Sequence, residues 1–376
     1  MMKKDDLDKR FFEGRKIEST TLGVTPSQLA ETGDDELDLV TLLRGTWISR
    51  AEGWNLIALP ASPSDLKVPP VPHSNNFRLL MNQYGETLKF NLPDTRVPNR
   101  GVTPDTNDKP DQLIDAITYE QIVVQKAVED FPVSIDRVRA ANGAPIHHEP
   151  GFFLQLLNHV TVGTSPDVGD GKEPKELSIA RMGTIPHGNS VLAMGFVTHD
   201  LTLDEKNDNA FPERITRDDE KFKTYFEPYD HFIAHPFYGC KDPAPTSGFP
   251  GFSPDHFHRI LKHTRDKLEV SKTTVLNFDT KFQSKNNLPG DKPSSDIPIS
   301  NIPFVKREAD VTEMHATFWI MELKNSDKCA PPEYVMQYSQ TVYLEFFDSS
   351  ELDSDGKPRR IRWPHVSINT LRKVDP

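Results

Sequence analysis

Residues 143–153 read GAPIHHEPGFF, and this stretch decides how the chain is interpreted. Pro145 introduces a strand, and successive side chains of a strand point to opposite faces. His147 and Glu149 therefore share one face, and His148 lies on the other. Because the three side chains diverge, they cannot converge on one metal ion. We predict a strand whose two faces differ in chemistry.

Strand-like runs bounded by Gly, Pro or Asn recur along the chain. They lie at Leu42–Arg50, Trp54–Leu59, Phe77–Met81, Thr87–Asn91, Asp115–Val124, Gly151–Leu157, Leu177–Thr184, Ser190–Thr198, Lys272–Phe282, Glu313–Leu323, Tyr334–Phe347 and Arg359–Val366. NQYGET at 82–87, PHGNS at 186–190 and DSDGKP at 353–358 predict hairpin turns between them. With 32 Pro and 20 Gly in 376 residues, long helices are disfavoured.

A series of antiparallel strands closes most economically into a barrel, because closure removes the exposed sheet edges. The predicted fold is therefore mainly β, a closed antiparallel β-barrel with long loops and one helical insertion. We expect residues 1–40 to form a polar N-terminal arm and residues 41–376 a single barrel domain. Within that domain, 198–300 is expected to be an insertion of loops and a helix.

The insertion contains one clear helix signal, Pro254–Leu268, with Ser253 as its expected cap. His256 and His258, at its start, are expected on an exposed polar face. Two further histidines, His231 and His235, would share a face if their segment were helical, as paired metal ligands do. Pro228 and Pro236 favour a loop there instead.

Two strands further along the chain carry clear face assignments. Trp47 is expected to plug the barrel interior, because a large aromatic side chain buries much area. In the 313–323 run, Met314, Ala316, Phe318 and Ile320 form the apolar face. Glu313, His315, Thr317 and Trp319 form the opposite face.

Composition excludes several functional classes. The net charge is −12, with 56 acidic and 44 basic residues, so nucleic acid is an unsuitable partner. Cys240 and Cys329 stand far apart, which indicates neither a disulfide framework nor a thiolate zinc site. Mean hydropathy is −0.57, and no apolar run is long enough to span a membrane. We expect a cytoplasmic protein with no membrane span.

Several motifs, taken in order, resemble those of the nitrobindin-like haem proteins, small antiparallel barrels related to fatty-acid-binding proteins. The matching residues are Gly45-Thr46-Trp47, Gly53-Trp54-Asn55-Leu56-Ile57, GAPIHHEPGF at 143–152, Pro186-His187-Gly188, and His365 with Leu371. The resemblance covers the barrel core in pieces, and most of 198–300 has no counterpart. The family's Tyr-Pro-Thr-Ile is replaced by residues 54–57, and its hairpin histidine falls on Ile185.

The resemblance implies haem b as cofactor, with His365 as the proximal iron ligand. It also implies that Trp54 and Leu56 line the cofactor pocket and that Asn55 offers a hydrogen bond to a small iron ligand. His187 would lie at the pocket mouth, with a possible distal role in catalysis.

His147 and Glu149 leave two alternatives. They could serve the cofactor site as a hydrogen-bonded pair, because a carboxylate fixes the tautomer of a neighbouring imidazole and raises its pKa. They could equally belong to the framework of the barrel.

By this resemblance the partners are haem and a small molecule, namely nitric oxide, peroxynitrite or peroxide. The implied reactions include isomerisation of peroxynitrite to nitrate and a peroxidase-like reaction. An alternative is a carrier or sensor that holds a fatty-acid-like apolar ligand without chemistry, since barrels of this size commonly hold one small ligand. A barrel filled by its own side chains is a third possibility.

Overall fold

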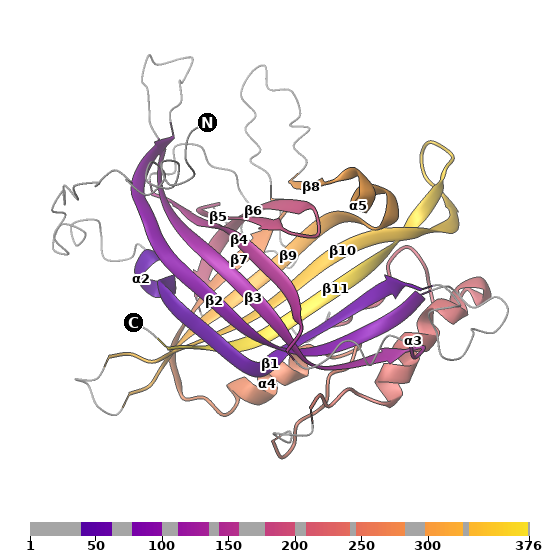
Figure 1. Cartoon of the computed structure of the whole chain (residues 1–376), viewed down its shortest axis with the longest axis horizontal. Coiled ribbons are helices and arrows are strands. Elements are labelled where there is room, and N and C mark those ends of the chain that lie inside the picture. The colour runs from indigo at the N-terminus through magenta and orange to yellow at the C-terminus, as the bar shows by residue number, and fades with distance from the viewer. Residues whose placement is uncertain are drawn as a thin grey trace, which may run out of the picture. The chain divides into compact units, whose positions relative to one another are not determined.

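The computed structural model describes residues 39–61, 77–99, 112–134, 143–157, 177–199, 208–240, 246–282, 298–325 and 331–374 (Figure 1). The predicted N-terminal arm lies outside these ranges except for its last two residues. The chain divides between Leu42 and Leu43, and every described strand belongs to the second part.

The helices are α2 (Leu39–Leu43), η4 (Glu220–Phe222), α3 (Lys223–Ala234), α4 (His258–Arg265) and α5 (Pro303–Glu308). The strands are β1 (Gly45–Pro60), β2 (Phe77–Asn99), β3 (Gln112–Phe131), β4 (Pro145–Leu156), β5 (Ile179–Ile185), β6 (Asn189–His199), β7 (Val270–Asp279), β8 (Ile299–Asn301), β9 (Asp310–Leu323), β10 (Tyr334–Leu352) and β11 (Pro358–Lys373). None of these helices has the length and apolar character needed to cross a membrane.

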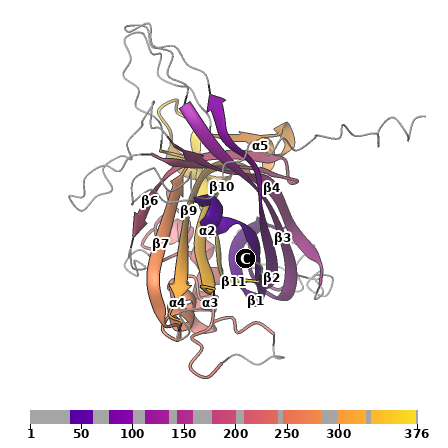
Figure 2. The same cartoon turned by 90° about the vertical axis from the view of Figure 1, so that its left-hand side faces the viewer.

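The strands form one antiparallel sheet that closes on itself, as predicted. Its order is β5-β4-β3-β2-β1-β11-β10-β9-β7-β6, and pairing of β5 with β6 completes the ring, while β8 adds to β6. In Figure 2 one wall contains β6, β7 and β9, and the facing wall contains β1 to β3. Hairpins at 186–188 and 353–357 join consecutive strands where the sequence predicted them.

One of the strand pairings that close the barrel involves few residues. β4 pairs with β5 only from Gly151 to Gln155, opposite Ile179–Gly183. Within the described residues, the first half of β4, from Pro145 to Pro150, has its register partners in β3 alone.

The predicted hairpin at 82–87 is wrong, because β2 runs through it without a turn. Gly85 at its centre marks a close backbone approach: a Cβ built there would lie 2.5 Å from the carbonyl oxygen of Arg50. The register of β1 shifts opposite this point, between Ser49 and Gly53. Gly85 therefore accommodates a bulge in the neighbouring strand β1, and the chain does not reverse direction at Gly85.

The barrel interior is packed around Phe153. Its ring is edge-on to those of Phe90, Tyr119, Phe278 and Phe318, with centroid separations between 5.1 and 5.7 Å. These five rings come from β2, β3, β4, β7 and β9, so one aromatic cluster joins both walls. Edge-to-face packing adds to the apolar area that they bury.

Trp47 is fully buried, as expected, and its Nε1 donates to the carbonyl oxygen of Leu43 at 2.8 Å. The predicted faces of the 313–323 run are also confirmed. Register pairs place Phe318 opposite Tyr338 on the interior, and Trp319 opposite Gln337 on the outer face.

The insertion packs on the outer face of the barrel. Trp54 of β1 contacts the rings of Phe237, Phe249 and Phe252, at centroid separations of 5.7, 5.3 and 5.9 Å. The predicted range 198–300 also includes β7, which pairs with β6 and β9 as a barrel strand. The part of the insertion outside the barrel wall therefore ends before Val270.

The insertion has two described α-helices where the sequence predicted one. α4 forms within the predicted 254–268 range but begins at His258. α3 forms despite Pro228, because Phe226, Tyr229 and Phe232 recur at helical spacing and are all buried. Most helical stability in proteins comes from such packing, which here outweighs the hydrogen bond lost at proline.

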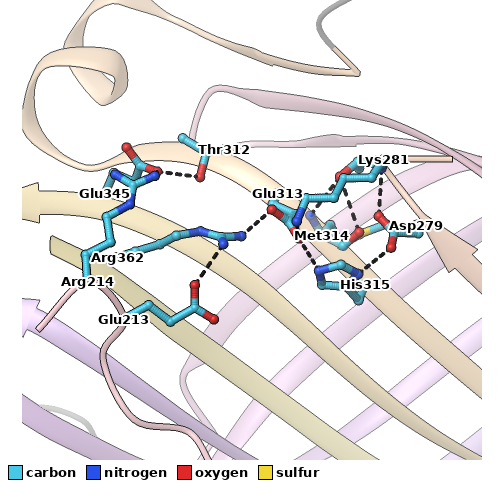
Figure 3. A network of polar contacts seen from close by, with 11 residues as sticks. Glu213, Arg214, Asp279, Lys281, Thr312, Glu313, Met314, His315, Glu345 and Arg362 are labelled. Atoms are coloured by element: carbon cyan, nitrogen blue, oxygen red, sulfur yellow. Dashed lines mark hydrogen bonds and ion pairs between the residues drawn. The ribbon is translucent and has the colours of Figure 1, made fainter. Parts of the chain in front are cut away.

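A charged cluster connects the insertion with the outer wall (Figure 3). Arg362 of β11 bonds Glu313 of β9 and, at 2.8 Å, Glu213 of the insertion. His315 bonds Glu313 through Nε2 and Asp279 of β7 through Nδ1, the latter at 2.6 Å. The cluster thus spans three barrel strands and one segment outside the wall.

The cluster predicts a loss of stability at alkaline pH. Burial opposes charge on His315, but its bonds to Asp279 and Glu313 outweigh burial and raise its pKa to about 9. A raised folded-state pKa adds stability that is complete below the unfolded value and is lost as pH rises through the folded one. We expect the free energy of unfolding, measured in urea from pH 6 to pH 10, to fall above pH 7 more steeply in the unmodified protein than in His315→Gln.

His148→Gln is the matched control, because it removes an exposed histidine whose partner is Glu120. Its pH dependence should parallel that of the unmodified protein. Parallel curves for His315→Gln as well would contradict a charged His315 in the cluster.

Candidate functional site

A buried ion pair crosses the interior of the barrel. Arg181 of β5 donates from Nη2 to Glu149 of β4 at 2.9 Å, and from Nη1 to Gln340 of β10 at 2.6 Å. Its Nε lies 3.3 Å from the hydroxyl oxygen of Tyr119, which also donates to Glu149. The guanidinium therefore joins β5 to the opposite wall as well as to its neighbours.

The charges of this pair are well compensated. Burial opposes ionisation of Glu149, but Arg181, with hydrogen bonds from His147 and Tyr119, lowers its pKa to about 2. The guanidinium also lies over the rings of Tyr119 and Phe153, at 5.5 and 5.8 Å. Glu149 is thus a fixed anion inside the barrel.

Gly183 provides the space that the ion pair occupies. A Cβ at this position would lie 2.4 Å from Glu149 Oε1 and 2.6 Å from the hydroxyl of Tyr119. The sequence analysis did not select Arg181, although its position in the apolar run LSIARMGT was a usable signal. A lone charge on the inward face of a strand needs a buried partner.

A second polar layer surrounds Glu86 of β2. Its Oε2 accepts from Tyr338 at 2.6 Å and from Asn369 at 2.7 Å, and its Oε1 accepts from Gln121 at 2.8 Å. Tyr338 in turn bonds Tyr84 at 2.8 Å. Burial raises the pKa of Glu86 because these hydrogen bonds only partly offset the loss of water. These residues come from strands far apart in the sequence and meet because of how the strands pair, so no local motif marks them.

His365 of β11 points into the barrel. It pairs with Val342 of β10 and lies on the same strand face as Asn369, which bonds Glu86 in the interior. Its Nε2 is enclosed and has no hydrogen-bond partner among the described residues. Burial, followed by the nearby His147 and His187, lowers the pKa of His365 to about 4. Its imidazole is therefore neutral at physiological pH.

Two of the other predicted site histidines lie close to His365. The rings of His147 and His187 are 6.2 Å apart, and His187 occupies the exposed turn between β5 and β6. Nε2 of His147 lies 3.2 Å from Glu149 Oε2. The structure thus brings together three residues that are far apart in the sequence and shows Glu149 both as His147's partner and as part of the framework.

Asn55 belongs to the same interior face. It pairs with Ser367, two residues from His365 on β11. A chain of amides orients it, in which Gln125 donates to Asn82 and Asn82 donates from Nδ2 to Asn55 Oδ1 at 2.8 Å. Because Asn55 Oδ1 accepts from Asn82, the Nδ2 group of Asn55 is the last donor in this series of amides.

Trp54 and Leu56 do not line the interior, which corrects their predicted role. Both are buried in the core under the insertion, on the face of β1 opposite to Asn55. The period of two explains the error, because residues 54, 55 and 56 of one strand cannot all face the same cavity.

Among the described residues, one of the other histidine groups has ligand atoms close enough together to hold a metal ion. His231 stacks on Phe131 with ring centroids 4.0 Å apart, and His235 Nδ1 lies 3.1 Å from the carbonyl oxygen of His231. Ligand atoms of Asp279, Glu313 and His315 lie within 4.8 Å of one another. In this structure both ring nitrogens of His315 are already bonded to the two carboxylates.

Comparison with known proteins gives limited information. No family model and no curated protein matches the sequence. Among solved structures, the crystal structure of Rv2717c from M. tuberculosis aligns over 93% of this chain and 99% of its own, at 10% sequence identity and a TM-score of 0.32.

The interior ion pair predicts a large effect of a small substitution. Glu149→Gln keeps the shape of the side chain but leaves the charge of Arg181 uncompensated, which should lower the free energy of unfolding by about 3–5 kcal/mol. Urea denaturation monitored by tryptophan fluorescence measures this change in the free energy of unfolding.

The control is Glu120→Gln on the outer side of the adjacent strand β3, where Glu120 pairs with His148 at 3.0 Å and both side chains are half exposed. Loss of such a surface pair should cost about 0–1 kcal/mol. Equal losses for the two variants would contradict the assigned role of Arg181.

Proposed function

We propose that this protein binds haem b in the barrel with His365 as the residue that would hold the iron, and that bound haem would supply the chemistry for a reaction with nitric oxide, peroxynitrite or peroxide. The observation that supports it best is the enclosed Nε2 of His365, which has no hydrogen-bond partner among the described residues. Buried polar atoms normally have a partner, so an unpartnered imidazole nitrogen suggests a missing ligand. A neutral imidazole is also the form that coordinates iron.

The surrounding side chains fit this cofactor. Asn55 is oriented by Asn82, so its Nδ2 can donate to an oxygen or nitrogen atom of a small ligand. Glu149 fixes the ring of His147, and His187 stands at the turn beside it. Bound haem would supply an iron centre with a position for the small molecule, and these residues would set the polarity of the pocket.

The alternative, a carrier of a fatty-acid-like ligand, has weaker support. A long apolar chain would have to lie among Arg181, Glu149 and Glu86, three buried ionisable groups with established partners. Displacing those partners would leave buried charges unpaired.

Titration with haemin tests the proposal. The unmodified protein should give a saturable one-to-one shift of the Soret band, and His365→Ala should bind haemin about tenfold more weakly or worse. Added imidazole should restore the original spectrum to the variant, because it replaces the missing ligand. His148→Ala, on the outer face, should titrate like the unmodified protein.

An unchanged titration of His365→Ala would refute His365 as the ligand. If the unmodified protein does not bind haemin but binds a fluorescent fatty acid saturably, the carrier alternative is favoured.

A further inference from the structure

Three polar residues from separate parts of the chain meet outside the barrel wall. Nε2 of His258, the first residue of α4, lies 2.8 Å from Oγ of Ser339 on β10. Nδ1 of the same ring lies 3.4 Å from Oδ1 of Asp208, at the start of the described insertion. The serine and the carboxylate lie at opposite ring nitrogens, as in a catalytic triad, and the contact between Nδ1 and Oδ1 is at ion-pair distance without the geometry of a hydrogen bond.

Each member is held by the fold. Ser339 follows the inward-facing Tyr338, so its hydroxyl lies on the outer face of β10. The carboxylate of Asp208 accepts the backbone N–H of His258 with both oxygens, at 3.0 and 2.9 Å. Gln337 of β10 fixes α4 by donating to the carbonyl oxygen of Leu261 at 2.8 Å.

Burial increases from the serine to the carboxylate. Ser339 keeps partial exposure, the side chain of His258 is 15% exposed, and that of Asp208 is 1% exposed. A buried carboxylate beside a histidine stabilises the imidazolium that forms when serine is deprotonated.

Two N–H donors in the same region have no hydrogen-bond partner within the described part of the chain. They are Nε1 of Trp319, a residue only 5% exposed, and Nη2 of Arg265 on α4. The Arg265 guanidinium lies 5.3 Å above the Trp319 ring, and the rings of Trp319 and His258 are nearly perpendicular with their centroids 6.4 Å apart. Buried donors without partners indicate that an oxygen atom of a ligand belongs there.

We propose that Ser339, His258 and Asp208 form a second site that hydrolyses carboxylic esters. Ser339 Oγ attacks the ester carbonyl carbon while His258 Nε2 takes the hydroxyl proton, and that proton then passes to the departing alcohol. Water attacks the resulting acyl-serine, giving one carboxylic acid and restoring the serine. Ser339 and His258 are catalytic residues, and Asp208 is a positioning residue.

This site is independent of the haem proposal. His258 and Ser339 lie on the outer side of β10, whereas His365 points into the barrel. His365→Ala should therefore hydrolyse esters like the unmodified protein, and Ser339→Ala should bind haemin like it. Failure of one proposal leaves the other unaffected.

The test uses the full chain with p-nitrophenyl acetate as substrate and a fluorophosphonate as probe. The unmodified protein should turn over repeatedly, and mass spectrometry should locate the phosphonyl group on Ser339. Ser339→Ala should lower kcat/KM by about 100-fold or more. Ser271→Ala is the matched control, since Ser271 is an exposed strand serine whose hydroxyl donates to a backbone carbonyl.

Asp208→Asn separates catalysis from a purely structural role. An asparagine oxygen still accepts the backbone N–H of His258, so the melting temperature should stay close to that of the unmodified protein. Without the carboxylate, kcat should fall about 100-fold while KM changes little. Any one of three results would overturn the proposal. They are an unchanged kcat in Asp208→Asn, no label on Ser339, and the same rate of hydrolysis in Ser339→Ala as in the unmodified protein.

Discussion

The ion pair between Arg181 and Glu149 determines how the interior of this barrel is built. Two charges without bulk water are tolerated only when their remaining hydrogen-bonding groups also find partners. Tyr119, His147 and Gln340 supply those partners from three further positions. Gly183 leaves the space that Glu149 and Tyr119 occupy, and Glu149 in turn holds the ring of His147.

The sequence predicted the class of fold well because strand alternation is a local signal. The faces of β4 and β9 followed directly from the period of two, and so did the conclusion that the three consecutive side chains at 147–149 cannot share one ion. The hairpin predicted at 82–87 was wrong because a glycine in a turn and a glycine beside a bulge have the same local sequence. α3 was missed because its stability comes from buried aromatic residues rather than from the helix propensity of its sequence.

The candidate sites were only partly predictable. His147, His187, His365 and Asn55 came from a motif resemblance, and the structure places all four on the interior side of the barrel or at its edge. Ser339, His258 and Asp208 carry no such motif, and His258 was expected to be exposed. Their proximity depends on where α4 packs against β10, which neither spacing nor periodicity of the sequence reveals.

The short pairing between β4 and β5 has a consequence for how this part of the barrel wall is held together. The backbone of the segment from Pro145 to Pro150 pairs with β3 alone among the described residues, so on the β5 side the segment is held by side chains, above all by the ion pair of Glu149 with Arg181. The prolines at its two ends lack N–H groups, which discourages another chain from pairing with that edge. His147 lies within this segment, so a change that breaks the ion pair of Glu149 should also release the ring of His147, which Glu149 holds at 3.2 Å.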